Sequence, residues 1–227
     1  MLTLNLLILK VALLKENENM LIDEGIKKNL RLSYDKKGQY REENEIQKWK
    51  LAEIDKVLGY MKKEDRTSLL DLGSGPGKQG RIFKDNGAEV TCIDISKEMI
   101  RFCREKGLNG YVMDFYNLVF GDESFDVAWS MNTLLHVPRN SIGGVLKNIK
   151  RVLKPNGIFY FGAYGGYNFE GVWEDDFYNP KRFFTFYGDS EIKEIVSEYF
   201  DVIEFSTIPI EEREVHYQSL ILRKNTI

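Results

Sequence analysis

Residues 69–80 read LLDLGSGPGKQG, an apolar run that ends in an acid and several glycines. A short apolar run followed by glycines is typical of a buried strand and the turn after it. Glycines let the backbone approach a ligand closely and adopt positive φ values. Because open α/β sheets bind ligands at the carboxyl ends of their parallel strands, this stretch predicts a ligand-binding loop after a first strand.

The chain around this loop alternates between strand and helix patterns. Strands are predicted over residues 68–72, 89–94, 111–114, 125–130 and 158–163, with helices over 78–86, 97–106 and 141–154. Such alternation indicates parallel β-α-β crossovers. The end of the chain differs, because a helix over 191–199 precedes two strands, 202–208 and 215–222, joined by a short charged turn. Two strands joined so closely pair antiparallel. The sequence predicts a doubly wound α/β fold with a mostly parallel, seven-stranded sheet and an antiparallel C-terminal hairpin.

Two kinds of ligand suit the glycine loop. Gly75, Gly77 and Gly80 form the GxGxxG pattern of dinucleotide-binding loops, which favours an NAD(P)-dependent oxidoreductase or a non-catalytic nucleotide-binding module. Asp71 lies two residues before Gly73, however, and an acid so close opposes a pyrophosphate. An acid at this place suits a cationic ligand instead.

The second predicted strand ends in Asp94, where a carboxylate can bind both hydroxyls of a ribose. With the segments that follow, the chain resembles the class I S-adenosylmethionine-dependent methyltransferases, of the methyltransferase type 11 kind. The segments that carry the resemblance, in that family's order, are LLDLGSGPGKQG at 69–80, CIDIS at 92–96, MDF at 113–115, FDVAWSMN at 125–132 and RVLKPNG at 151–157. The resemblance covers residues 68–163, and the terminal hairpin agrees with the family's reversed last strand.

The resemblance implies S-adenosyl-L-methionine as cofactor and methyl transfer as activity. It assigns these residues to the cofactor: Asp71, Gly73, Gly75, Gly77, Asp94, Ile95, Asp114, Phe115, Met131 and Asn132. Asp94 would bind the ribose, and Ile95 and Phe115 would lie beside the adenine. Each acid also has a local alternative. Asp71 could cap backbone N–H groups, Asp94 could start a helix, and Asp114 could form a turn.

His136 is the candidate catalytic residue, because it follows the strand end where an acceptor meets the methyl group in this family. The pKa of an unperturbed histidine suits a general base at neutral pH. A structural histidine before Pro138 is the alternative. A sulfonium leaves as a neutral sulfide, and alignment of donor and acceptor supplies much of the acceleration, so a base is needed only for an acceptor proton. Residues 130–133 (SMNT) lack the Asn/Asp-Pro-Pro-aromatic motif of methyltransferases that act on nucleobase amino groups.

We expect a small-molecule acceptor and neither a nucleic acid nor a membrane as partner; a methyltransferase acting on RNA or protein is the alternative. The net charge of −3, from 35 acidic and 32 basic residues, gives no strongly basic footprint. A macromolecular acceptor would favour a basic face, for which one predicted helix offers Lys147, Lys150, Arg151 and Lys154, although these also suit a solvated face. Residues 164–178 are aromatic and acidic, too polar for a strand, and are predicted as a lid over the acceptor or as a surface loop.

Residues 42–227 are predicted to form one methyltransferase domain, with a first helix over 42–63, a cofactor-binding core over 68–163 and an acceptor region over 164–227. Residues 1–41 are predicted as a lead-in, solvated and partly mobile from residue 15. Met1–Leu14 is apolar but too short for a membrane helix and lacks signal-peptide features, so it is an extra packed element or Met20 is the true start. The expected location is cytoplasmic. Two cysteines and two histidines predict neither a disulfide framework nor a metal site.

Overall fold

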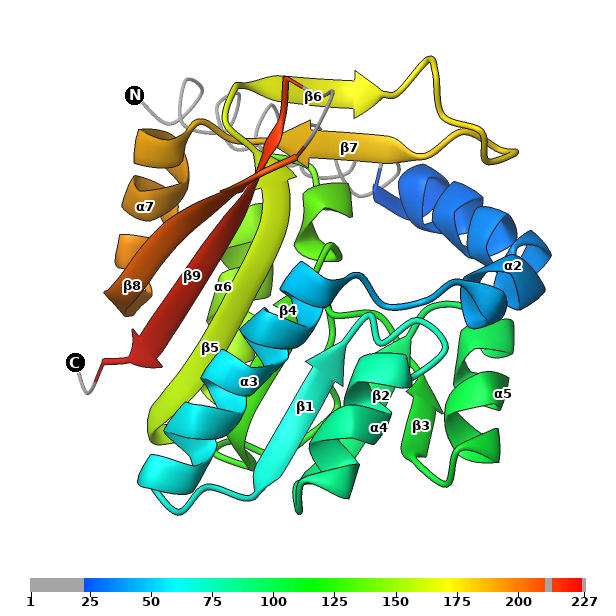
Figure 1. The fold of residues 1–227 in the computed structure, drawn as a ribbon. Coiled ribbons are helices and arrows are strands. Elements are labelled where there is room, and N and C mark those ends of the chain that lie inside the picture. Colours follow the sequence, from blue (N-terminus) through cyan, green and yellow to red (C-terminus); the bar gives the residue numbers. More distant parts are fainter. Residues whose placement is uncertain (1–22, 211–213, 226–227) are drawn as a thin grey trace, which may run out of the picture.

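The sheet has the predicted doubly wound topology with a reversed end (Figure 1). The computed structural model describes residues 23–210 and 214–225. The seven strands of the main sheet are β1 (Ser68–Leu72), β2 (Glu89–Asp94), β3 (Asn109–Val112), β4 (Phe125–Met131), β5 (Leu153–Gly165), β8 (Phe200–Pro209) and β9 (His216–Lys224). They are ordered β3-β2-β1-β4-β5-β9-β8; β1 to β5 pair in parallel, and β9 pairs antiparallel with both β5 and β8. The predicted fold class is therefore confirmed.

Helices cover both faces of the sheet and divide the hydrophobic core in two. Helices α3 (Lys48–Lys63), α4 (Lys78–Asp85) and α5 (Lys97–Glu105) pack on one face, and α6 (Ile142–Val152) and α7 (Asp189–Ser197) on the other. Successive side chains of a strand point to opposite faces, so Leu69 joins the first cluster and Leu70 the second. Ser96 caps α5 by accepting a hydrogen bond from the backbone N–H of Met99.

The strand order reverses between β1 and β4, and the glycine loop lies at this point. Gly73, Gly75 and Gly77 have φ values of 66°, 55° and 79°, in the region that favours glycine. Gly77 is the residue that precedes α4, and its left-handed conformation turns the chain from the loop into the helix. The loop therefore sits at the crevice where open α/β sheets bind ligands.

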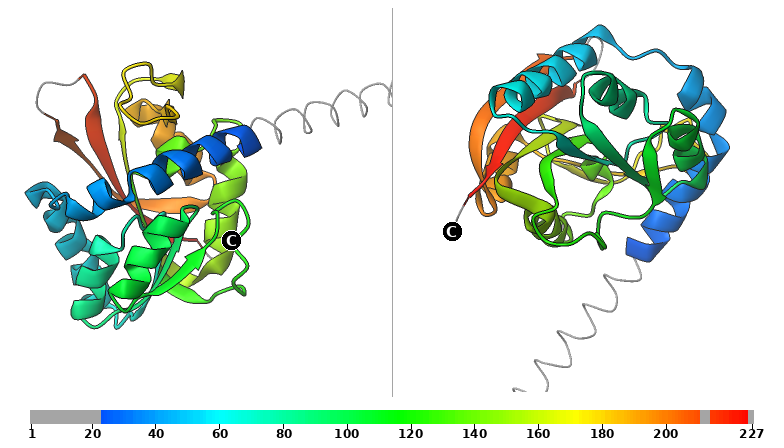
Figure 2. Two further views of the ribbon diagram at one scale, coloured as in Figure 1. Left: turned by 90° about the vertical axis from the view of Figure 1, so that its right-hand side faces the viewer. Right: turned by 90° about the horizontal axis from the view of Figure 1, so that it is seen from below.

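Two helices of the N-terminal segment cross the carboxyl edge of the parallel strands (Figures 1 and 2). Residues 23–36, here called the N-terminal helix, are followed by α2 (Gly38–Glu43). Residues 23–41, which were predicted as a solvated lead-in, are helical apart from a turn at Lys37, and part of this segment is buried. Leu30 and Ser33 are buried, and the Ser33 hydroxyl donates to the carbonyl oxygen of Pro180, so long-range packing orders this polar segment. Residues 1–22, including Met1–Leu14 and Met20, lie outside the described residues. Within the described ranges, no helix has the length and apolarity to cross a membrane.

The aromatic and acidic segment contributes one strand of a second, two-stranded sheet, so the prediction that it is too polar for a strand is wrong over residues 169–172. Strand β6 (Phe169–Val172) pairs antiparallel with β7 (Phe183–Phe186) above the main sheet (Figure 1). Its aromatic rings contact one another, as Phe169 and Phe186 do at 5.7 Å. Its acids pair with cations of this chain: Glu170 with Arg139, Glu174 with Lys181 and Asp176 with Arg182. These carboxylates are therefore already neutralised by internal partners.

The loop conformation predicts that Gly77→Ala destabilises the protein by about 2–4 kcal/mol. A Cβ there would lie 2.8 Å from the Cys103 sulfur and 2.8 Å from a Leu108 methyl group, at a φ of 79°. Gly87→Ala is the matched control, because Gly87 has a φ of 94° but open space around it, and it should cost about 1 kcal/mol. Urea unfolding measures both, and equal losses would contradict the packing argument.

Candidate active site

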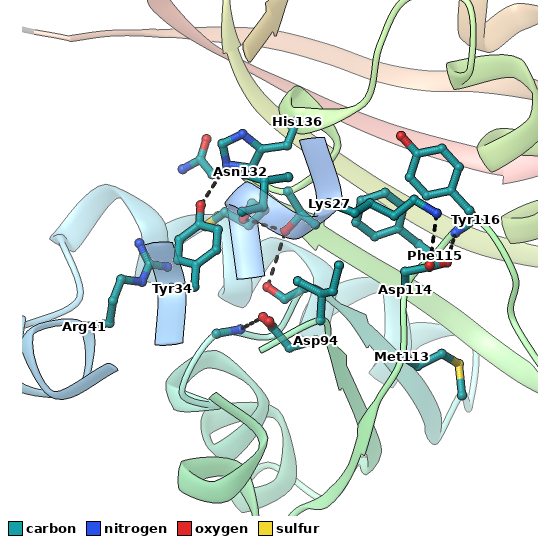
Figure 3. A pocket seen from close by; sticks show the side chains of 16 residues that line it. Lys27, Tyr34, Arg41, Asp94, Met113, Asp114, Phe115, Tyr116, Asn132 and His136 are labelled. Carbon is teal, nitrogen blue, oxygen red and sulfur yellow. Dashed lines mark hydrogen bonds and ion pairs between the residues drawn. The ribbon is translucent and has the colours of Figure 1, made fainter. Parts of the chain in front are cut away.

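A pocket lies at the crevice beside the glycine loop, beneath the N-terminal helix (Figure 3). It holds about 690 Å³ of space between atoms, its open mouth included. Of the residues that sequence predicted for the cofactor, it brings together Gly73, Gly75, Asp94, Ile95, Asp114, Phe115, Met131 and Asn132. It also brings the candidate base His136 to the same wall. Asp71 and Gly77 do not line this pocket.

Asp94 holds the crevice in shape. Its Oδ2 accepts a hydrogen bond from the backbone N–H of Gly75 at 3.0 Å, and its Oδ1 accepts one from Ser96 at 2.8 Å. Burial raises the pKa of Asp94 to about 6, while these two N–H groups act in the opposite direction. The carboxyl is therefore mainly ionised at neutral pH, and each of its oxygens can accept a further hydrogen bond.

Asp71 lies behind the loop and does not line this pocket, so its contact with the cofactor stays a prediction. Its side chain points to the α4 face, where Oδ2 is 3.2 Å from the position that a Cβ on Gly80 would take. This oxygen is buried and has no hydrogen-bond partner among the described residues. Burial, and then the nearby charge of Asp94, raise the pKa of Asp71 to about 8.

The residues after β3 form the far wall of the pocket. Asp114 accepts hydrogen bonds from the backbone N–H groups of Tyr116 and Asn117 at 2.9 and 3.1 Å, so it does form a turn. Its other oxygen faces the Lys27 ammonium at 3.4 Å, from the N-terminal helix. Phe115 stacks on Tyr116 with ring centroids 5.5 Å apart. This wall therefore combines flat apolar surface with one ion pair (Figure 3).

Asn132 ends β4 in a conformation that few residues tolerate. Its φ is 57°, which asparagine adopts more readily than most side chains. Its backbone N–H donates to the carbonyl oxygen of Gly162, so the turn is fixed. Its side-chain Oδ1 is buried and without a partner among the described residues, so the pocket wall carries a free acceptor.

His136 is held in one tautomer. Its Nδ1 lies 2.6 Å from the carbonyl oxygen of Phe183, which only accepts, so Nδ1 carries the proton and donates. Nε2 therefore accepts from the hydroxyl of Tyr34 at 2.7 Å, and Arg182 donates to the same hydroxyl oxygen at 3.2 Å. Burial, and then the charge of Arg182, lower the pKa of His136 to about 3. The imidazole is therefore neutral at physiological pH.

The sequence analysis missed the part of the wall that the N-terminal segment supplies. Lys27, Leu30 and Tyr34 line the pocket, as does Arg41 from α2. The first three lie at spacings of three and four residues, which places them on one face of a helix. That spacing was a usable signal in a segment whose polar composition concealed it.

Comparison with known proteins agrees with this geometry. The profile of a family described as a methyltransferase domain matches residues 70–161. The malonyl-[acyl-carrier protein] O-methyltransferase of Pseudescherichia vulneris is 36% identical over 109 residues, which are 47% of this chain and 43% of that protein. The resemblance to the class I S-adenosylmethionine-dependent methyltransferases is therefore confirmed over residues 70–161. Of the two cofactors that the glycine loop left open, S-adenosyl-L-methionine is the one that this family uses.

Two other proteins show how varied the relatives of this chain are. The sterol 24-C-methyltransferase of Gibberella zeae is 36% identical over 100 residues, 40% of this chain and 26% of that protein. Among solved structures, a 1,6-didemethyltoxoflavin-N1-methyltransferase from Burkholderia thailandensis with bound S-adenosylhomocysteine superimposes with a TM-score of 0.63. The two chains are 20% identical, and the match covers 77% of this chain and 79% of the Burkholderia chain. The likeness shows a shared fold. The chain spans less than half the length of the two curated relatives.

The residues of the pocket fit S-adenosyl-L-methionine. The lone pairs of Asp94 suit the ribose hydroxyls, and Ile95 and Phe115 offer apolar surface for an adenine ring. The ionised carboxylate of Asp94 disfavours a pyrophosphate in the pocket and suits a cationic sulfonium. The cofactor, when bound, supplies an electrophilic methyl group on a positively charged sulfur.

The buried carboxyl of Asp71 makes the stability of the ligand-free methyltransferase depend on pH. Its folded pKa of about 8 exceeds the ordinary value of 3.8, so its contribution to stability is present below about pH 4 and lost by about pH 8. Asp71→Asn should therefore gain free energy of unfolding relative to wild type by roughly 1 kcal/mol per pH unit between pH 5 and 8. Urea unfolding at both pH values measures this, with the exposed Asp85→Asn as control. Parallel pH profiles for Asp71→Asn and wild type would contradict the burial argument.

Proposed function

We propose that this chain transfers the methyl group of S-adenosyl-L-methionine to a small-molecule acceptor. The observation that carries the proposal is the pocket at the glycine loop. One part of its lining, with Asp94 and Phe115, suits the cofactor, and another part, with Asn132 and His136, is polar. The N-terminal helix roofs this pocket through Leu30 and Tyr34. A pocket covered in this way favours an acceptor that enters whole over one attached to a polymer.

The polar end of the pocket would orient the acceptor. Asn132 Oδ1 is a buried acceptor without a partner, and a buried polar atom of this kind is costly unless a ligand satisfies it. An N–H or O–H group on the methyl acceptor would do so. The Tyr34 hydroxyl, fixed between Arg182 and His136, lies at the same end (Figure 3). Fixed partners of this kind favour alignment of the acceptor with the methyl group.

The general-base role of His136 stays a prediction, and the surroundings of the ring work against it. Its Nε2 is occupied by the Tyr34 hydroxyl, and its pKa is lowered to about 3. A group with so low a pKa takes up a proton poorly at neutral pH. The geometry supports a different role better, in which neutral His136 holds the hydroxyl of Tyr34 in place for the acceptor.

The alternative of an RNA or protein acceptor receives little support from α6. The basic residues of α6 and the start of β5 are largely engaged within the chain, since Arg151 bonds to Asp122, Lys154 to Asp126 and Lys150 to Asn225. Arg151 also donates to the backbone carbonyls of Leu118 and Phe120, which fixes it against the loop before β4. These side chains are better explained as structural than as a surface for phosphates.

Incubation of metabolite extracts with S-adenosylmethionine labelled on its methyl group tests the proposal. Wild-type protein should move the label into small compounds and leave protein and RNA unlabelled. Asn132→Gly, which keeps the positive φ accessible and removes the amide, should slow transfer about 10- to 100-fold through loss of the acceptor contact. Asn156→Gly is the matched control, since Asn156 has a φ of 58° in a turn away from the pocket and should transfer like wild type. Label in RNA or protein instead would overturn the small-molecule assignment.

A further inference from the structure

Arg41 reaches from α2 to the glycine loop, where the described structure offers its charge no counterion. It lines the pocket, and its Nη2 lies 3.4 Å from the position that a Cβ on Gly75 would take. Its guanidinium stands 5.4 Å from the centre of the Tyr34 ring and bonds to the hydroxyl of Tyr178. Figure 3 shows it on the side of Tyr34 away from Phe115 and Asp114.

The other arginines near the site have carboxylate partners, and Arg41 does not. Arg182 pairs with Asp176 at 2.8 Å, and Arg139 pairs with Glu170 at 3.7 Å. Over residues 23–210 and 214–225, no carboxylate lies within ion-pair distance of Arg41. Asp94 attracts it from farther away, but the oxygens of Asp94 accept from backbone N–H groups. A half-buried guanidinium without a carboxylate partner favours an anionic ligand.

Neighbouring groups add to the local excess of positive charge. Lys50 of α3 is partly buried, and burial followed by the charge of Arg41 lowers its pKa to about 8. Lys78 begins α4 and donates to the carbonyl oxygen of Asn44; its pKa is also lowered, by burial first, with Arg41 contributing. The N-terminus of α4 points its own N–H dipoles toward the same loop. An anion bound at Arg41 would relieve the repulsion among these groups.

The extent of the proposed cofactor identifies which anion reaches this place. If the ribose of S-adenosylmethionine binds at Asp94 and its adenine at Phe115, the remaining part of the molecule is its amino-acid tail. This tail would lie along the Gly73–Gly75 loop. That tail ends in a carboxylate. We propose that Arg41 binds the α-carboxylate of S-adenosylmethionine, an assignment that rests on the proposed function. The planar guanidinium suits a carboxylate through two parallel hydrogen bonds.

This subsite gives the N-terminal segment a function in cofactor binding. A carboxylate held by Arg41 would link α2 to the glycine loop, two elements that are far apart in sequence. Tyr34, four residues before the start of α2, would then lie over the methyl-donating end. The same segment would thus bind the cofactor and complete the acceptor pocket.

Isothermal titration with two ligands that differ only in the carboxylate tests the assignment. The ligands are S-adenosylmethionine and decarboxylated S-adenosylmethionine, and the proteins are wild type, Arg41→Met, Arg41→Lys and Arg101→Met. Arg101 pairs with Glu98 and Glu105 on the exposed side of α5 and serves as the matched control. Unfolding midpoints of all four proteins establish that each is folded.

Wild type and Arg101→Met should bind S-adenosylmethionine about 10- to 100-fold more tightly than the decarboxylated ligand. Arg41→Met should lose most of this preference by weakening S-adenosylmethionine alone, and Arg41→Lys should retain part of it. A preference unchanged in Arg41→Met, or equal weakening of both ligands, would overturn the carboxylate subsite and leave the proposed function standing. Failure of wild type to bind either ligand would overturn the proposed function itself.

Discussion

The hydrogen bond from the Gly75 backbone to the Asp94 carboxylate is the interaction on which the site depends. It joins the loop after β1 to the end of β2, at the point where the strand order reverses. The bond keeps the loop open toward the crevice, because Gly75 can take a φ of 55° without a side chain in the way. A buried carboxylate held only by backbone N–H groups keeps lone pairs for a ligand. The ligand-binding geometry thus follows from one acid and the glycines opposite it.

The electrostatic balance of the pocket explains why it suits a ligand with separated charges. The β1 and β2 ends carry the buried carboxyl groups of Asp71 and Asp94, whose raised pKa values show the cost of placing negative charge there. The N-terminal segment carries Arg41 without a counterion. A cofactor with a positive sulfur and a negative carboxylate matches this arrangement, whereas a diphosphate would lie against the ionised carboxylate of Asp94.

The sequence predicted those parts of the site whose geometry is local. Gly73 and Gly75 were predictable because a strand end that turns sharply toward a ligand favours glycine, and Asp94 because it ends the next strand. The direction of the Asp71 side chain was not predicted, because strand parity was not considered. It shares the face of Leu69, which packs under α3 to α5, so its side chain points behind the loop.

The remaining differences come from packing between distant segments. Tyr34 and Arg41 belong to a polar segment whose helices are fixed by contacts such as Ser33 with Pro180. No local pattern specifies such a contact. Strand β6 was missed for a related reason, because the acids of its segment are neutralised by cations distant in sequence, as Glu170 is by Arg139.

Titration calorimetry of the purified protein with S-adenosylhomocysteine and with NADH tests the central claim most directly. The claim is that the crevice between Gly75 and Asp94 binds a sulfur nucleoside with an amino-acid tail and not a dinucleotide. The account predicts saturable binding of S-adenosylhomocysteine with one site per chain, and no heat of binding for NADH at the same concentrations. Saturable binding of NADH, with none for S-adenosylhomocysteine, would contradict it.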